Sequence, residues 1–190
     1  MSHDEIIRAH LNAHLAAVEK LRAQEEFIAD LAQRLISALE AGKKILFFGN
    51  GGSAADAQHL AAEFVVRYRR NRRALPAIAL TTDTSIITAG SNDFGFESIF
   101  SRQIEALANE GDVVVGISTS GNSANILQGL TAAKEKGCLV IAFTGESGGK
   151  SADIADLTFH APSSVTAHIQ ECHITVGHIL CEIVESHFIE

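Results

Sequence analysis

The chain has 190 residues, a length that suits one α/β domain with some additional helix. Its composition of 46% hydrophobic and 20% charged residues is that of an ordinary globular protein, and no apolar run approaches the roughly 20 residues that cross a bilayer. The formal net charge of −8 excludes a general nucleic-acid binder, because such proteins need basic surface to displace counterions. A small anionic ligand is still allowed, since a local site can be positive in an acidic protein.

The N-terminus and the cysteines predict a cytoplasmic protein. Residues 1–20 carry Asp, Glu and His within their apolar pattern, which is not the pattern of a signal peptide. The three cysteines, Cys138, Cys172 and Cys181, are odd in number and form no C-x-x-C pair. Unpaired, buried thiols in a reducing compartment are therefore expected.

The first part of the chain is predicted to be helical. Residues 3–40 lack proline and repeat apolar residues at three- and four-residue steps, which predicts a long helix with a bend. A leading helix of this length often packs against another subunit, so it hints at oligomerisation.

From Gly42 onward the pattern changes to short apolar runs, which are typical of strands buried on both faces, with helical patterns between them. The predicted strands are residues 44–48, 76–81, 112–118, 138–144 and 157–161, and the predicted helices are residues 54–68, 97–109, 123–136 and 165–188.

Strands that alternate with helices predict an α/β fold, with a three-layer, doubly wound, five-stranded parallel sheet. Because the chain has no internal repeat, low-complexity tract or linker, residues 1–190 are predicted to form a single domain. Within it, residues 1–41 are the N-terminal helical extension and residues 42–190 are the α/β core.

Two glycine-rich loops follow predicted strands. Gly49-Asn-Gly-Gly-Ser53 comes after the first strand, and Ser118-Thr-Ser-Gly-Asn-Ser123 comes after the third. Open parallel sheets bind ligands at these strand ends, where glycine admits a ligand close to the backbone and free N–H groups at a helix start favour an anion. Either loop alone also fits a tight turn with an N-cap. The two together favour a ligand that carries a phosphate.

Neither loop is a nucleotide fingerprint. The G-x-x-x-x-G-K-[ST] pattern is absent, and Ala54 takes the place of the last glycine of G-x-G-x-x-G. The second predicted strand ends in Ala79-Leu-Thr-Thr82, without the acidic residue that grips a dinucleotide ribose. No nucleotide cofactor is expected.

Two helical segments carry groups suited to proton transfer. His59 and Glu63 are four residues apart and share a helix face, and Gln170 and His178 lie on one stripe of the last helix. A carboxylate and an imidazole suit aldose–ketose isomerisation, in which one group removes a proton from the carbon beside the carbonyl and another serves the oxygens of the cis-enediol. Taken singly, His59 and Glu63 also fit a surface pair, and His178 also fits a buried core histidine.

Two basic groups have alternative interpretations. The arginines within residues 67–73 are either a solvated turn or a cluster from which one or two side chains reach an anionic substrate. His10 and His14 have metal-like spacing, but a solvated or interface face is expected for them.

Five segments together resemble the sedoheptulose 7-phosphate (phosphoheptose) isomerases of the sugar-isomerase (SIS) family, over essentially the whole chain. They are residues 49–59, 92–96, 116–123, 144–149 and 169–171, the last followed by His178. The resemblance implies a flavodoxin-like SIS fold and a homotetramer with active sites at subunit interfaces. It also implies conversion of sedoheptulose 7-phosphate to D-glycero-D-manno-heptose 7-phosphate, the first step in supplying heptose for lipopolysaccharide or other surface glycans.

The resemblance also implies roles for matching residues. Glu63 would be the base at the sugar carbon and His178 its acid/base partner. The phosphate would be held by Ser118, Thr119, Ser120 and Ser123. The residues implied to contact the sugar or shape its pocket are Asn50, Gly51, Gly52, Ser53, His59, Glu63, Arg67, Asn92, Asp93 and Gln170.

Members of the family can carry zinc, with ligands that match His59, Glu63, Gln170 and His178. A zinc-bound carboxylate is a weaker base, so Glu63 would either shift on substrate binding or work with a metal that polarises the carbonyl. The family usually has Arg where this chain has His168, which bears on the hydrogen bonding near Gln170.

Three alternatives are open at this point. The first is a non-catalytic SIS tetramer that binds the bacterial replication initiator, which the presence of Glu63 and His178 disfavours. The second is a sugar-phosphate-sensing regulatory domain, for whose usual DNA-binding module 190 residues leave no room. The third is an isomerase of another sugar phosphate, which only a comparison of substrates would separate.

Overall fold

Five parallel strands form one sheet in the order β2-β1-β3-β4-β5 in the computed structural model, which describes residues 1–189. The strands are β1 (Ile45–Gly49), β2 (Ala77–Ala79), β3 (Val113–Ile117), β4 (Leu139–Thr144) and β5 (Leu157–His160). The predicted α/β fold with a five-stranded parallel sheet is therefore confirmed, and the second strand is shorter than predicted.

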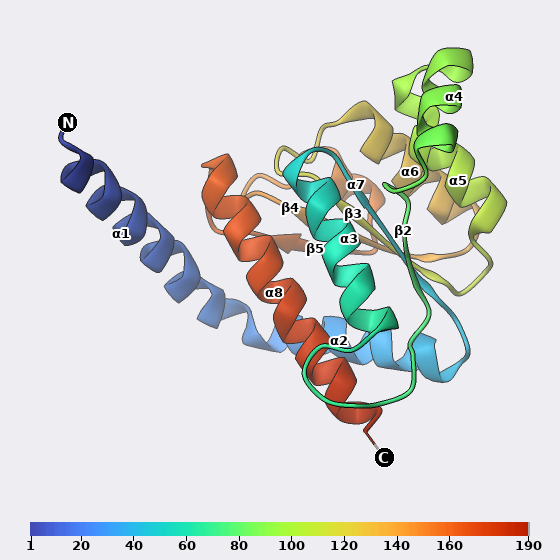
Figure 1. Cartoon of the computed structure of the whole chain (residues 1–190), viewed down its shortest axis with the longest axis horizontal. Helices are drawn as coiled ribbons and strands as arrows, with labels where there is room; N and C mark the ends of the chain where they lie inside the picture. The colour runs from blue at the N-terminus through green and yellow to red at the C-terminus, as the bar shows by residue number, and fades with distance from the viewer. Residues whose placement is uncertain (190) are drawn as a thin grey trace.

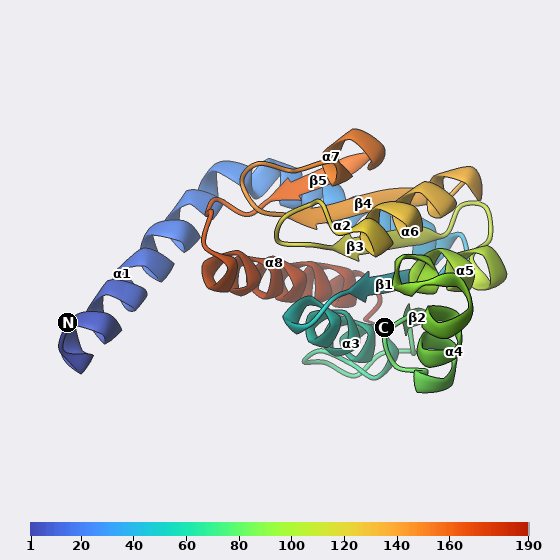
Figure 2. The ribbon, with the colours of Figure 1, turned by 90° about the horizontal axis from the view of Figure 1, so that it is seen from above.

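Helices cover both faces of the sheet (Figure 2). One face is covered by α2 (Glu25–Glu40), α3 (Gly52–Val65) and α8 (Thr166–His187). The other is covered by α4 (Thr84–Phe94), α5 (Ile99–Leu107), α6 (Ala124–Glu135) and the short α7 (Ser151–Ile154). These are the three layers that the alternating pattern predicted.

The strands contribute side chains to two separate hydrophobic clusters, because successive side chains of a strand point to opposite faces of the sheet. In β1, Ile45 and Phe47 join the cluster under α2, α3 and α8, whereas Leu46 and Phe48 join the cluster under α5 and α6. Every residue of β1 is buried, as expected for a strand covered on both sides.

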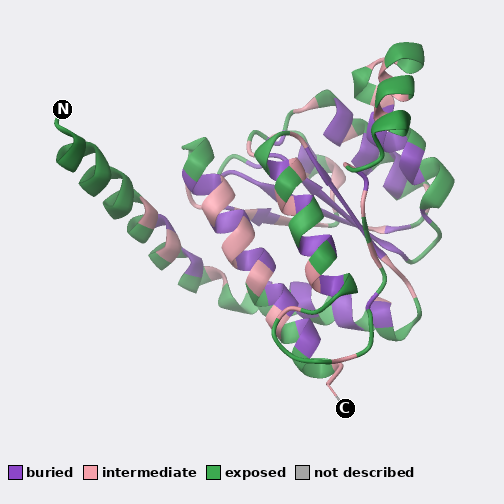
Figure 3. Ribbon diagram, viewed as in Figure 1, coloured by how far each residue is buried: buried purple, intermediate pink, exposed green. Residues whose placement is uncertain are grey.

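The N-terminal helix stands apart from these layers. Helix α1 (His3–Leu21) begins at a Ser2–Glu5 capping box and is followed by a 3-10 turn, η1 (Arg22–Gln24), which produces the predicted bend. The ribbon shows α1 projecting away from the sheet, with nearly its whole outer half exposed (Figures 1 and 3). Only Ala17 and Leu21 of α1 are buried.

Helix α4 was not predicted. Its sequence is rich in Thr, Ser, Gly and Asn, which are weak helix formers, so tertiary contacts and the Asp83 N-cap, which accepts from the Ile86 N–H at 3.0 Å, establish it instead. No helix within residues 1–189 is long and apolar enough to cross a membrane.

Candidate active site

The two glycine-rich loops lie side by side because β1 and β3 are neighbours in the sheet although α3, β2, α4 and α5 separate them in the chain. The strand order changes direction between β1 and β3, which is where ligands bind in such sheets. A reciprocal amide pair joins the loops: Asn50 and Asn125 each donate to the other's side-chain oxygen at 2.8 Å. Asn125 is buried in the first turn of α6 and was not singled out from the sequence.

Glycine is required in the first loop for two different reasons. Gly51 has φ +56°, a left-handed conformation that side chains rarely adopt. At Gly52, an added Cβ would lie 2.5 Å from Gln170 Nε2, so the side chain of Gln170 rests directly on this loop. The structure thus brings predicted residues from the two ends of the sequence together here.

The backbone of the second loop packs directly against the backbone of residues 144–149. An added Cβ on Gly121 would lie 2.0 Å from the Gly148 oxygen, and Gly145 N–H donates to the Thr119 oxygen at 3.0 Å. The same loop lines a cleft of about 340 Å³. The residues that line this cleft are Thr119, Ser120, Asn122, Gly145, Glu146, Ser147, Ser163, Ser164, Thr166 and Ile169.

The four predicted phosphate residues therefore have two different positions. Thr119 and Ser120 line the cleft together with the hydroxyl groups of Ser147, Ser163, Ser164 and Thr166. Ser118 is buried and its Oγ accepts from the Gly121 N–H at 3.2 Å, while the Ser118 and Ser123 hydroxyls lie 3.4 Å apart. Ser118 and Ser123 thus hold the shape of the loop, and Thr119 and Ser120 face the open cleft.

The acid–base candidates meet where α3 runs beside α8. The Nε2 atoms of His59 and His178 are 2.8 Å apart, and His59 Nε2 is 3.6 Å from a Glu63 carboxylate oxygen. The helices approach this closely because Gly177 has no side chain: an added Cβ there would lie 2.6 Å from Leu60 Cδ2. His59 therefore lies next to both Glu63 on its own helix and His178 on α8.

The surroundings of His178 disfavour its protonated form. Burial lowers the pKa of the imidazole, the neighbouring His59 lowers it further, and Glu63 opposes both. The Tyr68 ring packs against it, with ring centroids 5.4 Å apart. The lowered pKa favours the neutral imidazole, which has one nitrogen to donate and one to accept.

The four predicted zinc ligands are not gathered around one point in this structure. Zinc ligands stand about 2.0–2.2 Å from the ion, so tetrahedral ligand atoms lie about 3.3 Å from one another. His59 Nε2 lies 2.8 Å from His178 Nε2 and 3.6 Å from a Glu63 carboxylate oxygen, but within residues 1–189 the three side chains do not bring one ligand atom each within 4.8 Å of one another. Gln170 lies eight residues before His178 on α8, so the two backbone positions are about 12 Å apart along the helix, and the Gln170 side chain packs on Gly52.

A second group of potential metal ligands lies on the other side of α8. One ligand atom each of His10, His168 and Glu171 fall within 4.8 Å of one another. His14 Nδ1 also contacts the Glu171 carboxylate, at 2.7 Å. Burial alone would raise the pKa of Glu171, but its hydrogen bonds with the three histidines lower it to about 2. The sequence pattern showed the spacing of His10 and His14 but not their partners on α8.

One arginine of the basic segment has a structural role. The Arg72 side chain is 1% exposed, donates to the Glu63 carbonyl oxygen at 2.7 Å and lies 3.8 Å from a Glu185 carboxylate oxygen. The backbone N–H groups of Tyr68, Arg69 and Arg70 each donate to Glu185 at 2.8 Å. Neither the solvated-turn nor the substrate interpretation applies to Arg72. Nothing in the helical pattern around Glu185 indicates these partners.

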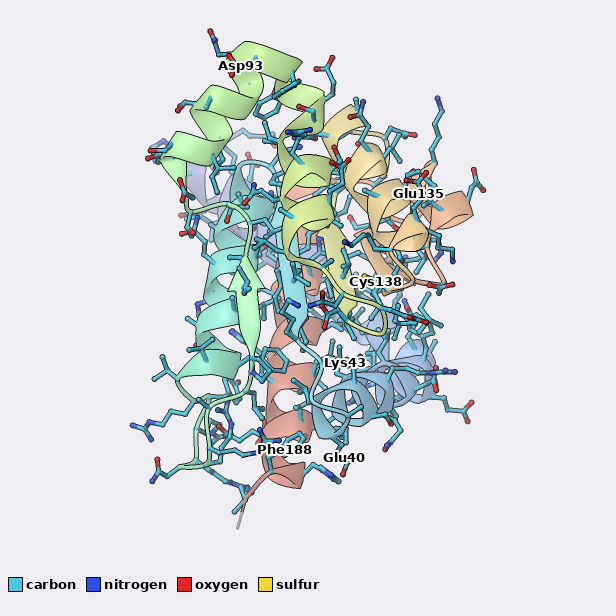
Figure 4. The ribbon with its side chains drawn as sticks, turned by 90° about the vertical axis from the view of Figure 1, so that its right-hand side faces the viewer. Glu40, Lys43, Asp93, Glu135, Cys138 and Phe188 are labelled. Atoms are coloured by element: carbon cyan, nitrogen blue, oxygen red, sulfur yellow. The ribbon has the colours of Figure 1, made fainter. Side chains whose placement is uncertain are left out.

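Arg67, Asn92 and Asp93 lie apart from the loops. Arg67 is exposed just after the end of α3. Asn92 and Asp93 are exposed on α4, where Asn92 donates to Asp93 at 2.7 Å. Asp93 lies at the outer tip of α4, at the opposite end of the molecule from Phe188 (Figure 4). Within residues 1–189, no hydrogen bond joins Asn92 or Asp93 to the glycine-rich loops.

The sequence is similar to a known family and to named proteins within it. Residues 9–145 match the family described as SIS domain. A phosphoheptose isomerase from Aquifex aeolicus is 59% identical over 181 residues, which cover 95% of this chain and 93% of the relative. One from Geobacter sulfurreducens is 56% identical over 180 residues, covering 94% and 95%.

Solved structures give the same result. A phosphoheptose isomerase from Neisseria gonorrhoeae superposes with a TM-score of 0.91 at 43% identity, covering 97% of this chain and 100% of that one. One from Francisella tularensis has a TM-score of 0.94 at 38% identity, covering 98% and 100%. The chain belongs to the SIS domain family and, within it, to the phosphoheptose isomerases. The family predicted from the sequence is confirmed.

Proposed function

We propose that the protein is the aldose–ketose isomerase that interconverts sedoheptulose 7-phosphate and D-glycero-D-manno-heptose 7-phosphate. The observation that carries the proposal is the contact of His59 on α3 with His178 on α8, with Glu63 next to His59, on the helix that follows the first glycine-rich loop. The full-length likeness to phosphoheptose isomerases supports the isomerase prediction and does not favour the initiator-binding or other-sugar alternatives.

The proposed reaction needs one base and one acid/base partner. Glu63 takes a proton from C1 of the ketose, beside the C2 carbonyl, and leaves a cis-enediol(ate). His178, neutral and able both to donate and to accept, gives a proton to O2 and receives the proton of O1. Glu63 then returns its proton to C2, and the product is the aldose.

The substrate is proposed to extend between the two loops. Its phosphate lies in the cleft beside Thr119 and Ser120, at the start of α6, in a loop that Ser118 and Ser123 support. The sugar is contacted by the first loop and by residues of α3 and α8. The residues proposed for the sugar are Asn50, Gly51, Gly52, Ser53, His59, Glu63, Arg67 and Gln170.

Asn92 and Asp93 are proposed to complete the site in a homotetramer with active sites at subunit interfaces. Their exposure at the tip of α4 leaves them available to a second copy. Apolar side chains on the projecting α1 support an assembly, because Ile7, Leu11 and Leu15 are 56%, 55% and 64% exposed.

Zinc is proposed to bind His59, Glu63, Gln170 and His178. When bound, it would polarise the substrate carbonyl and make the neighbouring C–H bond more acidic. Because Glu63 is both a proposed ligand and the proposed base, its carboxylate must turn toward C1 when substrate enters.

The protein is proposed to act in the cytoplasm, as the first step in supplying heptose for lipopolysaccharide. All three cysteines are free and buried, which suits a reducing compartment.

Turnover of sedoheptulose 7-phosphate tests the proposal directly. We expect the parent protein to form the aldose, and Glu63→Gln and His178→Gln each to lose about 10²–10⁴-fold in kcat, the usual contribution of a proton-transfer group. The matched controls are Glu182→Gln and His187→Gln, which change the same residue types at exposed positions of α8. Absence of turnover by a folded parent supplied with zinc would contradict the proposal.

A further inference from the structure

A cluster of three imidazoles around one carboxylate joins the N-terminal helix to the C-terminal helix. Glu171 Oε1 is 3.1 Å from His10 Nε2, and Glu171 Oε2 is 2.7 Å from His14 Nδ1 and 2.8 Å from His168 Nδ1. The residues of α1 and α8 in this cluster are up to 161 positions apart in the sequence. Nothing in the proposed reaction uses them.

The cluster is separate from the proposed catalytic groups. His168 and Glu171 are three residues apart, so they share the face of α8 that meets α1. Gln170 points elsewhere, onto Gly52 at the start of α3. The α1 side of α8 is therefore a second polar site on the same helix.

Structural stability alone gives a poor account of the cluster. A carboxylate on the surface is satisfied by water, and exposed ion pairs contribute little, about 0–1 kcal/mol. Here Glu171 is surrounded by three rings, and the His10 and His168 rings are packed with centroids 4.5 Å apart. Two imidazole nitrogens and a carboxylate oxygen gathered within 4.8 Å of one another are also the ligand types that hold Zn²⁺ in proteins.

The donor set and spacing suit a late first-row divalent cation. Imidazole nitrogen and carboxylate oxygen are common ligands of Zn²⁺, Co²⁺ and Ni²⁺. The ligand atoms of His10, His168 and Glu171 lie within 4.8 Å of one another, so small rotations of the exposed His10 ring would bring all three to one ion. The His10 side chain is 51% exposed, which leaves an open path for the ion to enter.

We propose that His10, His168 and Glu171 form a second metal site that binds Zn²⁺ or a similar cation and fastens α1 to α8. His14 donates to the Glu171 carboxylate and orients it, as hydrogen-bonded partners of metal ligands do. The fourth ligand is water. Because only Ala17 and Leu21 of α1 are buried, this clamp is the principal attachment of the outer part of the helix to its own chain.

Metal binding tests the proposal in a protein that lacks the other proposed site. The full chain carrying His59→Asn and His178→Asn is freed of metal and titrated with Co²⁺ alone. We expect about one Co²⁺ per chain, with the visible absorption of a tetrahedral site. Adding His10→Asn is expected to abolish this binding, and adding His14→Asn to weaken it about 10–100-fold. His3→Asn, on the same helix but outside the cluster, is the matched control and should change nothing.

A second measurement separates a metal site from a hydrogen-bonded cluster. We expect Zn²⁺ to slow backbone hydrogen exchange in residues 3–21 of the His59→Asn/His178→Asn protein but not after His10→Asn is added. His10 is half exposed, so its replacement leaves the fold intact, which circular dichroism checks. Failure of the folded double variant to bind Co²⁺ would overturn the proposal. Binding that survives both His10→Asn and His168→Asn would overturn it too.

Discussion

Helix α8 carries histidine side chains on two of its sides, and the neighbouring helix is packed tightly on one side and mostly exposed on the other. Toward α3, His178 meets His59 across a tightly packed contact in which Gly177 lies against Leu60. Toward α1, His168 and Glu171 meet histidines of a helix that is mostly exposed. Packing positions the first group and polar contacts position the second. The proposed catalytic groups are thus placed by the packed core, whereas the groups facing α1 are proposed to hold that helix in place.

The largest expected effect is a loss of stability when Glu185 is replaced. Glu185 lies near the C-terminal end of α8 and accepts hydrogen bonds from the backbone that follows α3. Glu185→Ala removes the acceptor of three backbone N–H groups and leaves the buried Arg72 charge without its partner. Breaking such a pair costs about 3–5 kcal/mol of unfolding free energy. Urea unfolding measures the loss, with Glu182→Ala as control: its exposed pair with Arg69 is worth about 1 kcal/mol or less. Equal losses in the two variants would contradict this account.

A smaller effect is expected on the α1 side. Leu15→Glu places a charge in an apolar stripe that a second copy is proposed to cover, and it removes a leucine side chain whose burial stabilises an assembly by about 1.5–3 kcal/mol. Light scattering should show a smaller assembly while circular dichroism stays unchanged. Asn12→Glu adds the same charge to an exposed polar position and should leave the assembly intact. A tetramer that persists in Leu15→Glu would show that this stripe is not an interface.

The contact between α3 and α8 is sensitive to a single methyl group. Gly177→Ala would place its Cβ 2.6 Å from Leu60 Cδ2, and overpacking of this kind costs about 1–3 kcal/mol. Because the shift separates His178 from Glu63, we expect kcat to fall by up to about 100-fold. Gly90→Ala on α4 is the control, since its nearest new contact is at 3.9 Å. Unchanged turnover in Gly177→Ala would mean that the two helices need not be this close.

The smallest expected effect is a pH dependence of stability. Burial raises the pKa of Glu185, but N–H bonds from Arg69, Arg70 and Tyr68 and the charge of Arg72 outweigh it, so the pKa is lowered on folding. The stabilisation is therefore fully present above the unfolded-state pKa of about 4.3 and is lost as the pH falls through the lower folded value. Glu185→Gln should flatten this acid dependence in urea unfolding, whereas Glu182→Gln should not. If the unfolding free energies of the parent, Glu185→Gln and Glu182→Gln depended on pH in the same way, Glu185 would not be the cause of the acid dependence.

Much of the fold could be predicted because its signals are local. Buried strands appear as short apolar runs, and the long helices α2, α3 and α8 appear as regular repeats. Helix α4 could not be found in this way, because residues with weak helical preference are held in place by contacts with other elements. The same limit applies to Arg72, whose arginine-rich segment reads as solvent-exposed although this side chain is buried.

The sequence by itself determined the sheet, the two glycine-rich loops and the residue types at the proposed active site, because backbone preferences and ligand chemistry act over a few neighbouring residues. Only the tertiary structure decided which groups meet. The Asn50–Asn125 pair, the Glu185 contacts and the α1–α8 histidine cluster each join residues that are 75 or more positions apart. Such contacts follow from the order of strands and the crossing of helices, and no local pattern records them.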